Sequence, residues 1–96
     1  MNKLPCVYIM TNRPHGTLYV GVTSDITRRV FRHRNLCVEG FTSKYQLTRL
    51  VFYERHECMY EAIQREKRIK WWKRSWKIRL IEEFNPDWRD LFEEVC

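Results

Sequence analysis

The sequence predicts a small α+β domain that contains a β-hairpin, a third strand and several helices. Two short runs of β-branched and aromatic residues enclose a segment that carries Asn, Pro and Gly, which is typical of a hairpin. Farther along, apolar residues recur three and four positions apart, which is typical of helices packed on a core. Because 96 residues have room for one hydrophobic core, we expect a single domain over residues 1–96.

The hairpin is predicted from the runs Val7–Thr11 and Leu18–Val22, with Asn12–Thr17 as the loop between them. Gly21 lies inside the second run and has no side chain to pack. Its position predicts a bulge, or a close approach by another backbone or a ligand.

A helix is expected from about Asp25 to Arg34, since Asp25 is a favourable N-terminal cap. One face of this helix carries Arg29 and His33 beside two apolar residues. Charge is costly to bury without a partner. These two side chains are therefore candidates for a functional site.

Gly40–Lys44 is predicted to be a loop and Gln46–Glu54 the third strand, and the next helix is expected to begin near Glu57. The predicted core-facing stripe of that helix contains Met59, Ala62, Ile63, Glu66 and Ile69. A carboxylate in an apolar stripe either pairs with a buried cation or coordinates a metal ion. Glu66 is thus the most informative residue of the helix.

The last third of the chain is predicted to contain two more helices. Residues 71–76 are expected to turn the chain, with Ser75 as the cap of a helix that ends at Phe84. Asp87 is expected to cap a short final helix over Trp88–Glu94.

The net charge of +6 is unevenly distributed. Residues 65–79 contain eight Lys or Arg and one acid, whereas residues 82–94 contain six Asp or Glu and one Arg. The basic segment also holds three tryptophans, at positions 71, 72 and 76. Cations interleaved with aromatic rings suit a polyanion such as nucleic acid. A solvated helix face explains the charge equally well, and packing explains the tryptophans better than base stacking.

The same composition excludes several classes of protein. No apolar run is long enough to span a membrane. The N-terminal residues lack the features of a signal peptide, so we expect a cytoplasmic protein. The four cysteines are widely spaced without a C-x-x-C pair, which favours free buried thiols over disulfides or a zinc site.

The sequence resembles the GIY-YIG nucleases. The first family motif corresponds to Cys6-Val7-Tyr8 and the second to Tyr19-Val20-Gly21, with ten residues between the tyrosines. The family arginine, ten residues after the second tyrosine, matches Arg29, and the glutamate of the long helix matches Glu66. A closing motif resembles residues 85–91, which begin with Asn85. The resemblance covers nearly the whole chain and implies a three-stranded antiparallel sheet flanked by about four to five helices.

The resemblance also implies a role for each matching residue in hydrolysis of a DNA phosphodiester. Tyr8 would act as the general base or position the attacking water, and Tyr19 would hold water or phosphate. Arg29 would bind the phosphate, and His33 would relay a proton or contact phosphate. Glu66 would be the protein ligand of one divalent metal ion, Mg²⁺ or Mn²⁺, with water and phosphate as the other ligands.

Residues that would bind the nucleic acid complete this hypothesis: Arg28, Arg32, Lys67, Lys70, Lys73, Arg74 and Asn85. The substrate is expected to be DNA, branched or damaged DNA included, with RNA as an alternative, and sequence preference is expected to be weak. A protein partner would supply specificity, because family members acquire site choice from an additional domain.

Two departures from the family pattern leave other functions open. Cys6 stands where the first motif has glycine, and Val22 stands where many repair members have a lysine that contacts phosphate. The alternatives are a nucleic-acid-binding module with little turnover and a protein-interaction domain that docks through its acidic tail. Tyr8 and Tyr19 would then be ordinary strand residues, and Arg29 and Glu66 a buried structural ion pair.

Overall fold

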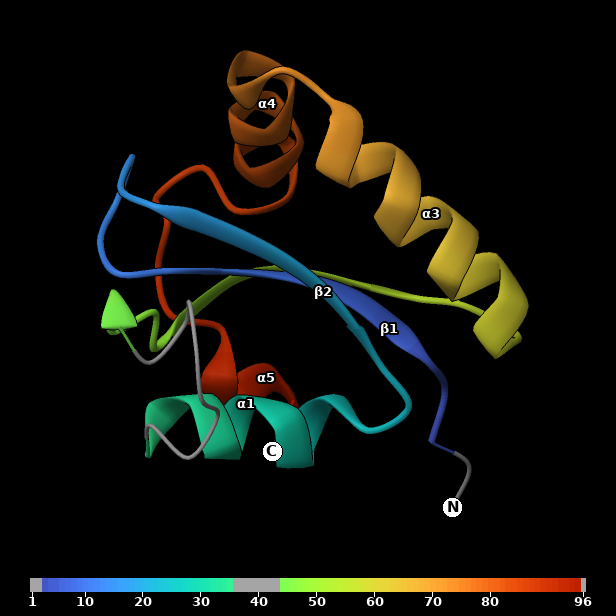
Figure 1. Ribbon diagram of the computed structural model, residues 1–96. Helices are drawn as coiled ribbons and strands as arrows, with labels where there is room; N and C mark the ends of the chain where they lie inside the picture. The colour runs from blue at the N-terminus through green and yellow to red at the C-terminus, as the bar shows by residue number, and fades with distance from the viewer. Residues whose placement is uncertain (1–2, 36–43, 96) are drawn as a thin grey trace.

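The computed structural model describes residues 3–35 and 44–95. In it, a three-stranded sheet lies between two layers of helices (Figure 1). The elements in chain order are β1 (Cys6–Thr11), β2 (Leu18–Thr23), α1 (Ile26–Arg34), β3 (Arg49–Arg55), α3 (Met59–Trp71), α4 (Arg74–Phe84) and α5 (Phe92–Val95). The helices α3 and α4 cover one face of the sheet, and α1 and α5 cover the other.

The predicted α+β class and antiparallel sheet are confirmed. The strand order is β2-β1-β3, so β1 is central and β2 is an edge strand. Both neighbours of β1 run antiparallel to it, and Tyr8 lies opposite Gly21 on one side and Tyr53 on the other. The pairing of β1 with β2 is regular, whereas the pairing with β3 shifts between Ile9 and Met10.

Alternation along β1 divides the core into two clusters. Tyr8 and Met10 pack with the residues of α1 and α5, while Val7 and Ile9 pack with those of α3 and α4. Successive side chains of a strand point to opposite faces, so a central strand covered on both faces has to be apolar throughout. All six residues of β1 are buried accordingly.

The third strand begins later than predicted. Gln46–Glu54 was expected, but β3 begins at Arg49 and extends to Arg55. Gln46 has a φ of 54°, a left-handed conformation that breaks an extended chain. The predicted loop over Gly40–Lys44 lies, apart from Lys44, outside the described residues.

The predicted cap of α4 is wrong. The helix begins at Arg74, so Ser75 lies inside it, and Lys73 occupies the cap position without a side-chain hydrogen bond. The Arg74 guanidinium instead donates to the carbonyl oxygens of His15 and Gly16, at 2.8 and 2.6 Å. This contact fastens the hairpin loop to the start of α4.

The predicted final helix is also wrong at its start. Trp88 has a φ of 55° and packs in the cluster on the α3 and α4 side of the sheet. Leu91, three residues on, packs in the cluster on the other side. A helix would place these two side chains on the same face, so the chain crosses between the layers in a non-helical form. Asp90, and not Asp87, then caps α5 by accepting from the Phe92 amide at 3.0 Å.

Asn85 holds this crossing in place. Its amide nitrogen donates to the carbonyl oxygens of Val51 and Arg89, at 3.2 and 2.9 Å, and its amide oxygen accepts from the Arg89 backbone at 3.3 Å. The residue is only 3% exposed. The predicted contact of Asn85 with nucleic acid is therefore replaced by a structural role.

We expect Asn85→Ala to lower the free energy of unfolding by about 2–4 kcal/mol, because one buried and two partly buried backbone groups lose a hydrogen-bond partner. Urea unfolding followed by circular dichroism measures this change. Asp87→Ala serves as the control, since Asp87 is exposed and does not cap α5, and it should change stability by less than about 0.5 kcal/mol. Equal losses in both variants would contradict the role of Asn85.

No helix in the described ranges is long and apolar enough to cross a membrane. Cys6 and Cys58 are free thiols, as predicted, although Cys58 is exposed rather than buried. Cys37 and Cys96 lie outside the described residues.

Candidate active site

Two tyrosines of the hairpin lie together on the face of the sheet that α1 covers. Tyr8 on β1 is fully buried, and Tyr19 on β2 is half-buried, with ring centroids 6.2 Å apart. Gly21 makes room for them. A Cβ atom at Gly21 would lie 2.6 Å from the hydroxyl of Tyr8 and 2.9 Å from the ring of Tyr19. The predicted bulge is absent from the β1–β2 pairing, and the close approach at Gly21 comes from the Tyr8 side chain.

His33 completes this cluster from α1. Its Nε2 atom lies 3.2 Å from the hydroxyl of Tyr8, and its ring centroid is 5.8 Å from that of Tyr19. The helix brings His33 inward because Ile26 and Val30, seven and three residues earlier, pack on the same face. The predicted inward face of this helix is thus confirmed for His33, which is 2% exposed.

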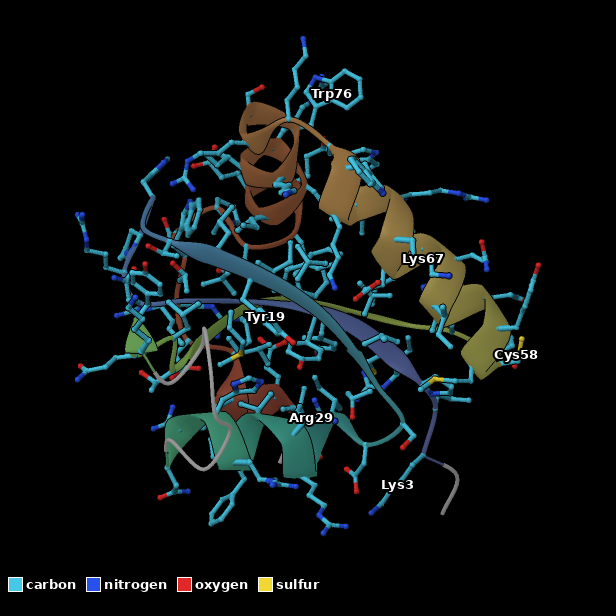
Figure 2. All side chains as sticks on the ribbon, viewed as in Figure 1. Lys3, Tyr19, Arg29, Cys58, Lys67 and Trp76 are labelled. Carbon is cyan, nitrogen blue, oxygen red and sulfur yellow. The ribbon has the colours of Figure 1, made fainter. Side chains whose placement is uncertain are left out.

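Arg29 borders the cluster one turn earlier on α1. Figure 2 shows Arg29 and Tyr19 on the α1 side of the sheet, and Arg29 is half-buried. Burial raises the pKa of Tyr8 well above its ordinary value of 10.0, and the nearby hydroxyl of Tyr19 raises it further. Attraction and hydrogen bonding from Arg29 oppose these effects without cancelling them. Tyr8 is therefore a neutral phenol at physiological pH.

Burial lowers the pKa of His33, whereas it raises that of Tyr8. Loss of solvation, assisted by the charge of Arg29, lowers the pKa of His33 from 6.5 to about 4. The ring is therefore neutral at pH 7. Its Nδ1 atom is buried and has no hydrogen-bond partner within the described residues. A buried polar atom without a partner lowers the stability of the fold.

The histidine also predicts a dependence of stability on pH. The unfolded chain binds a proton at His33 near pH 6.5, whereas the folded chain does so only near pH 4. The stability that the neutral His33 ring preserves above pH 6.5 is lost as the pH falls toward 4. We expect the free energy of unfolding to drop by about 2 kcal/mol between pH 7 and pH 5 from this residue. Urea unfolding at both pH values measures this drop. In His33→Gln, the difference in the free energy of unfolding between the two pH values should be much smaller.

Glu66 lies on α3, on the other side of the sheet from this cluster. It faces inward between Ala62 and Ile69, which are core residues, as the predicted stripe requires. Met59 departs from that stripe and is 38% exposed. The carboxylate of Glu66 pairs with Lys70, one turn along the helix, at 2.7 Å. The predicted alternative of an ion pair between Arg29 and Glu66 is therefore wrong.

The edge strand β2 lies between the tyrosine cluster and Glu66. α3 contacts β2 and β1 from one side, and α1 lies on the other (Figure 1). In Figure 2, Tyr19 and Arg29 lie below β2 and Lys67 of α3 lies above it. The structure thus brings Tyr8, Tyr19, Arg29 and His33 together and places Glu66 across the same edge strand. Within the described residues, no hydrogen bond or ion pair links Glu66 to that cluster.

The donor set around Glu66 is consistent with a metal that uses one protein ligand. Its side chain keeps 10% of its surface exposed, and its ion-pair partner Lys70 is half-exposed. No group of three or more His, Cys, Asp or Glu side chains in the described ranges could hold a metal ion. Mg²⁺ is commonly bound by one or two carboxylates together with water and phosphate, so Glu66 alone fits such an ion.

Three arginines of α1 line a polar hollow beside the cluster. It has a volume of about 250 Å³ and is lined by Thr23, Ser24, Asp25, Arg28, Arg29 and Arg32. Hydroxyl groups and guanidinium groups together suit a phosphate. The arginines were predicted from the sequence, whereas Thr23 and Ser24 were not. Their position directly before the helix was the signal that could have identified them.

The basic residues of α3 and α4 differ in how they are used. Lys67 and Lys73 are exposed, and the Lys73 ammonium lies 5.9 Å from the ring centroid of Trp76. Lys70 pairs with Glu66, and Arg74 binds the hairpin loop. Of the four residues predicted here to contact nucleic acid, Lys67 and Lys73 are therefore the most available.

Comparison with known proteins shows which family the chain belongs to. Residues 4–79 match the model of the GIY-YIG catalytic domain. The chain belongs to the GIY-YIG family. It is 35% identical over 68 residues to a UPF0213 protein of Staphylococcus saprophyticus and 37% identical over 68 residues to one of Staphylococcus aureus, which covers 71% of this chain and 83% of each relative. No solved structure matches the chain.

Membership of the GIY-YIG family assigns the domain to a nuclease-type fold. GIY-YIG nucleases generally depend on a divalent metal ion. The names of the staphylococcal relatives state no activity.

Proposed function

We propose that this GIY-YIG domain is a metal-dependent endonuclease that cuts DNA with little intrinsic sequence preference. The observation that carries the proposal is the buried cluster of Tyr8, Tyr19 and His33 next to the arginine-lined hollow of α1. Within the described residues, the buried Nδ1 atom of His33 has no hydrogen-bond partner, which is unusual for an ordinary core. A phosphate-binding hydrolytic site accounts for both features.

Hydrolysis of a phosphodiester requires positioned water, cationic stabilisation of the phosphate, and help for the leaving oxygen. Arg29 lines the hollow and contacts the tyrosine cluster, so its guanidinium would hold the phosphate next to Tyr19. Arg28 and Arg32 would add charge around the same phosphate backbone. A backbone that crosses the β2 edge would meet Arg29 on one side and Glu66 on the other.

Tyr8 would position Tyr19 and water rather than remove a proton by itself. Its phenol is fully buried and neutral, and its hydroxyl is shared with His33 and Tyr19. His33 is likewise neutral and is 2% exposed, so it would orient Tyr8 by hydrogen bonding. Among these three residues, Tyr19 has the most exposed side chain and is the one placed to reach the substrate.

Glu66 would hold the divalent ion, Mg²⁺ or Mn²⁺, which supplies Lewis-acid stabilisation of charge on the phosphate. Lys70 now occupies the carboxylate, so its ammonium has to move outward when the ion is bound. Both side chains lie on α3, and only the lysine rotamer has to change.

The ion pair of Glu66 with Lys70 favours one alternative, a nucleic-acid-binding module with little turnover. Val22 supports the same alternative, since a lysine there would have added a phosphate contact. Docking through the acidic tail has less support. Asp90 pairs with Arg34, and Glu94 accepts from Tyr53 and Arg89, so these acids are used within the chain.

A nicking assay on supercoiled plasmid tests the proposal. Purified protein should convert the plasmid to open circles in Mg²⁺ or Mn²⁺, and a chelator should stop the reaction. A panel of branched and damaged DNA, together with RNA, would identify the preferred substrate. Salt-sensitive binding without any cutting, with either metal, would favour the binding module instead.

A further inference from the structure

The corner between α3 and α4 exposes two tryptophans. Trp71 ends α3 and is 89% exposed, and Trp76 lies in the first turn of α4 and is 53% exposed. Figure 2 shows Trp76 at the outer end of α4, directed away from the sheet. The prediction that the tryptophans serve packing is therefore wrong for Trp71, whereas it holds for Trp72, which packs against the core. Trp72, between them, is half-buried and contacts Trp76 edge-on, with ring centroids 6.1 Å apart.

Exposed tryptophans are unusual because burial of so large an apolar ring is strongly favourable. A group of exposed aromatic rings marks a binding surface more often than a solvated one. In the described part of the chain, the ring of Trp71 contacts no other aromatic ring and no cation. Its faces are therefore open to a ligand.

The charge around this corner favours a polyanion. Lys67 precedes Trp71 by four residues and so shares its face of α3. The Lys73 ammonium lies 5.9 Å from the ring centroid of Trp76. The acids nearby are already engaged, because Glu83 pairs with Arg79 at 3.2 Å and Glu66 with Lys70. Among the described residues, no ion pair engages Lys67 or Lys73.

A hollow of about 300 Å³ lies beside Trp76 and is lined by Trp72, Trp76, Arg79, Leu80 and Glu83. Its walls combine aromatic, aliphatic and charged groups. A flat aromatic ligand that carries a phosphate would contact all three kinds of group.

We propose that this corner binds the unpaired bases of a single DNA strand. Trp71 and Trp76 provide the stacking surfaces, and Lys67 and Lys73 contact the phosphates. Base pairs in a duplex hide the faces of their bases within the stack, so only an unpaired strand offers them to a protein ring. The corner thus distinguishes single-stranded from duplex DNA.

The same corner deepens the proposed nuclease function, on which this part of the inference rests. Trp71 follows Glu66 by five residues, a rise of roughly 7 Å along α3. Glu66 faces the sheet and Trp71 faces solvent, so a strand that stacks on Trp71 has to pass around α3 to bring a phosphate to Glu66. The preferred substrate class is a duplex that carries an unpaired segment beside the bond to be cut.

The test is binding of a labelled oligothymidylate and of a duplex of the same length to the full chain, in chelator so that nothing is cut. Fluorescence anisotropy measures both affinities. We expect Trp71→Ala and Trp76→Ala each to weaken single-strand binding about tenfold, and to weaken duplex binding by less than about threefold. Trp71→Phe should retain most of the affinity because phenylalanine still stacks.

Tyr60→Ala is the matched control. Tyr60 is 66% exposed at the opposite end of α3. The substitution therefore removes an exposed aromatic ring without changing the corner. Its affinity for the single strand should equal that of the parent. Thermal unfolding confirms that each variant is folded. Because Trp71 is exposed, its replacement should leave the fold intact.

Several results would overturn the inference. The inference would be wrong if both tryptophan variants bound the single strand with the affinity of the parent. It would also be wrong if they lost equal affinity for the duplex and for the single strand. Stronger binding of oligouridylate than oligothymidylate would replace DNA with RNA, and no binding of either at low salt would leave a protein as the ligand. These outcomes differ from failure of the nuclease proposal, in which Glu66→Gln cuts plasmid normally while the tryptophan variants still lose single-strand affinity.

Discussion

We expect Glu66→Gln to reduce nicking of supercoiled plasmid by at least about 100-fold while the fold is retained. Glutamine matches the shape of the side chain but lacks the charge that holds a divalent ion. Loss of the ion removes its stabilisation of the phosphate, which is commonly worth several kcal/mol of the barrier. Single-turnover cleavage with excess protein isolates this effect from binding.

The stability of the Glu66→Gln variant should change little. Its ion-pair partner Lys70 is half-exposed, and pairs with an exposed member contribute about 1 kcal/mol or less. Glu61→Gln is the control, because Glu61 lies on the same helix, is exposed, and carries the same charge. Mn²⁺ titration followed by electron paramagnetic resonance should show weaker binding for Glu66→Gln alone. If Glu66→Gln cuts as well as the parent, the assignment of the metal site is wrong.

Arg29→Ala is the second change with a large expected effect, and it should lower the cleavage rate by about 100-fold or more. Its guanidinium joins the phosphate hollow to the tyrosine cluster, so its loss affects the reacting phosphate directly. Removal of one preorganised donor at a developing charge typically costs about two to three orders of magnitude in rate. Plasmid nicking at saturating protein measures this loss.

Arg32→Ala provides the comparison for Arg29→Ala. Arg32 lines the same hollow but is exposed, so its loss should weaken DNA binding and flatten the salt dependence while the rate at saturation stays near the parental value. Tyr8→Phe should be impaired like Arg29→Ala, because the hydroxyl shared with His33 is lost. Equal, small effects of Arg29→Ala and Arg32→Ala would show that Arg29 acts only as a surface charge.

Much of this arrangement could be predicted from the sequence. The spacing of β-branched residues predicted the hairpin, and helical spacing placed Ala62, Glu66 and Ile69 on one buried face. Arg29 and His33 stood out because they share a face with apolar residues, and the structure brings both to the tyrosines. Local patterns suffice here because periodicity decides which side chains share a face.

Other features followed from contacts that no local pattern contains. The early part of the expected third strand is lost at Gln46, and the last helix starts late because Trp88 and Leu91 pack on opposite faces of the sheet. Gly21 is needed because the Tyr8 side chain lies against it, which depends on the pairing of two strands. The partner of Glu66 is Lys70 rather than Arg29, because the sheet separates the two helices.

The sequence by itself determined the family, the hairpin, and the set of polar residues that are unusual among the apolar positions of a hydrophobic core. Only the tertiary structure decided how those residues are used, because burial and partners depend on which layers meet. The core encloses Asn85 and leaves Trp71 open to solvent, the reverse of what their positions in the sequence predicted. Side-chain periodicity is local, whereas desolvation depends on the whole packed chain.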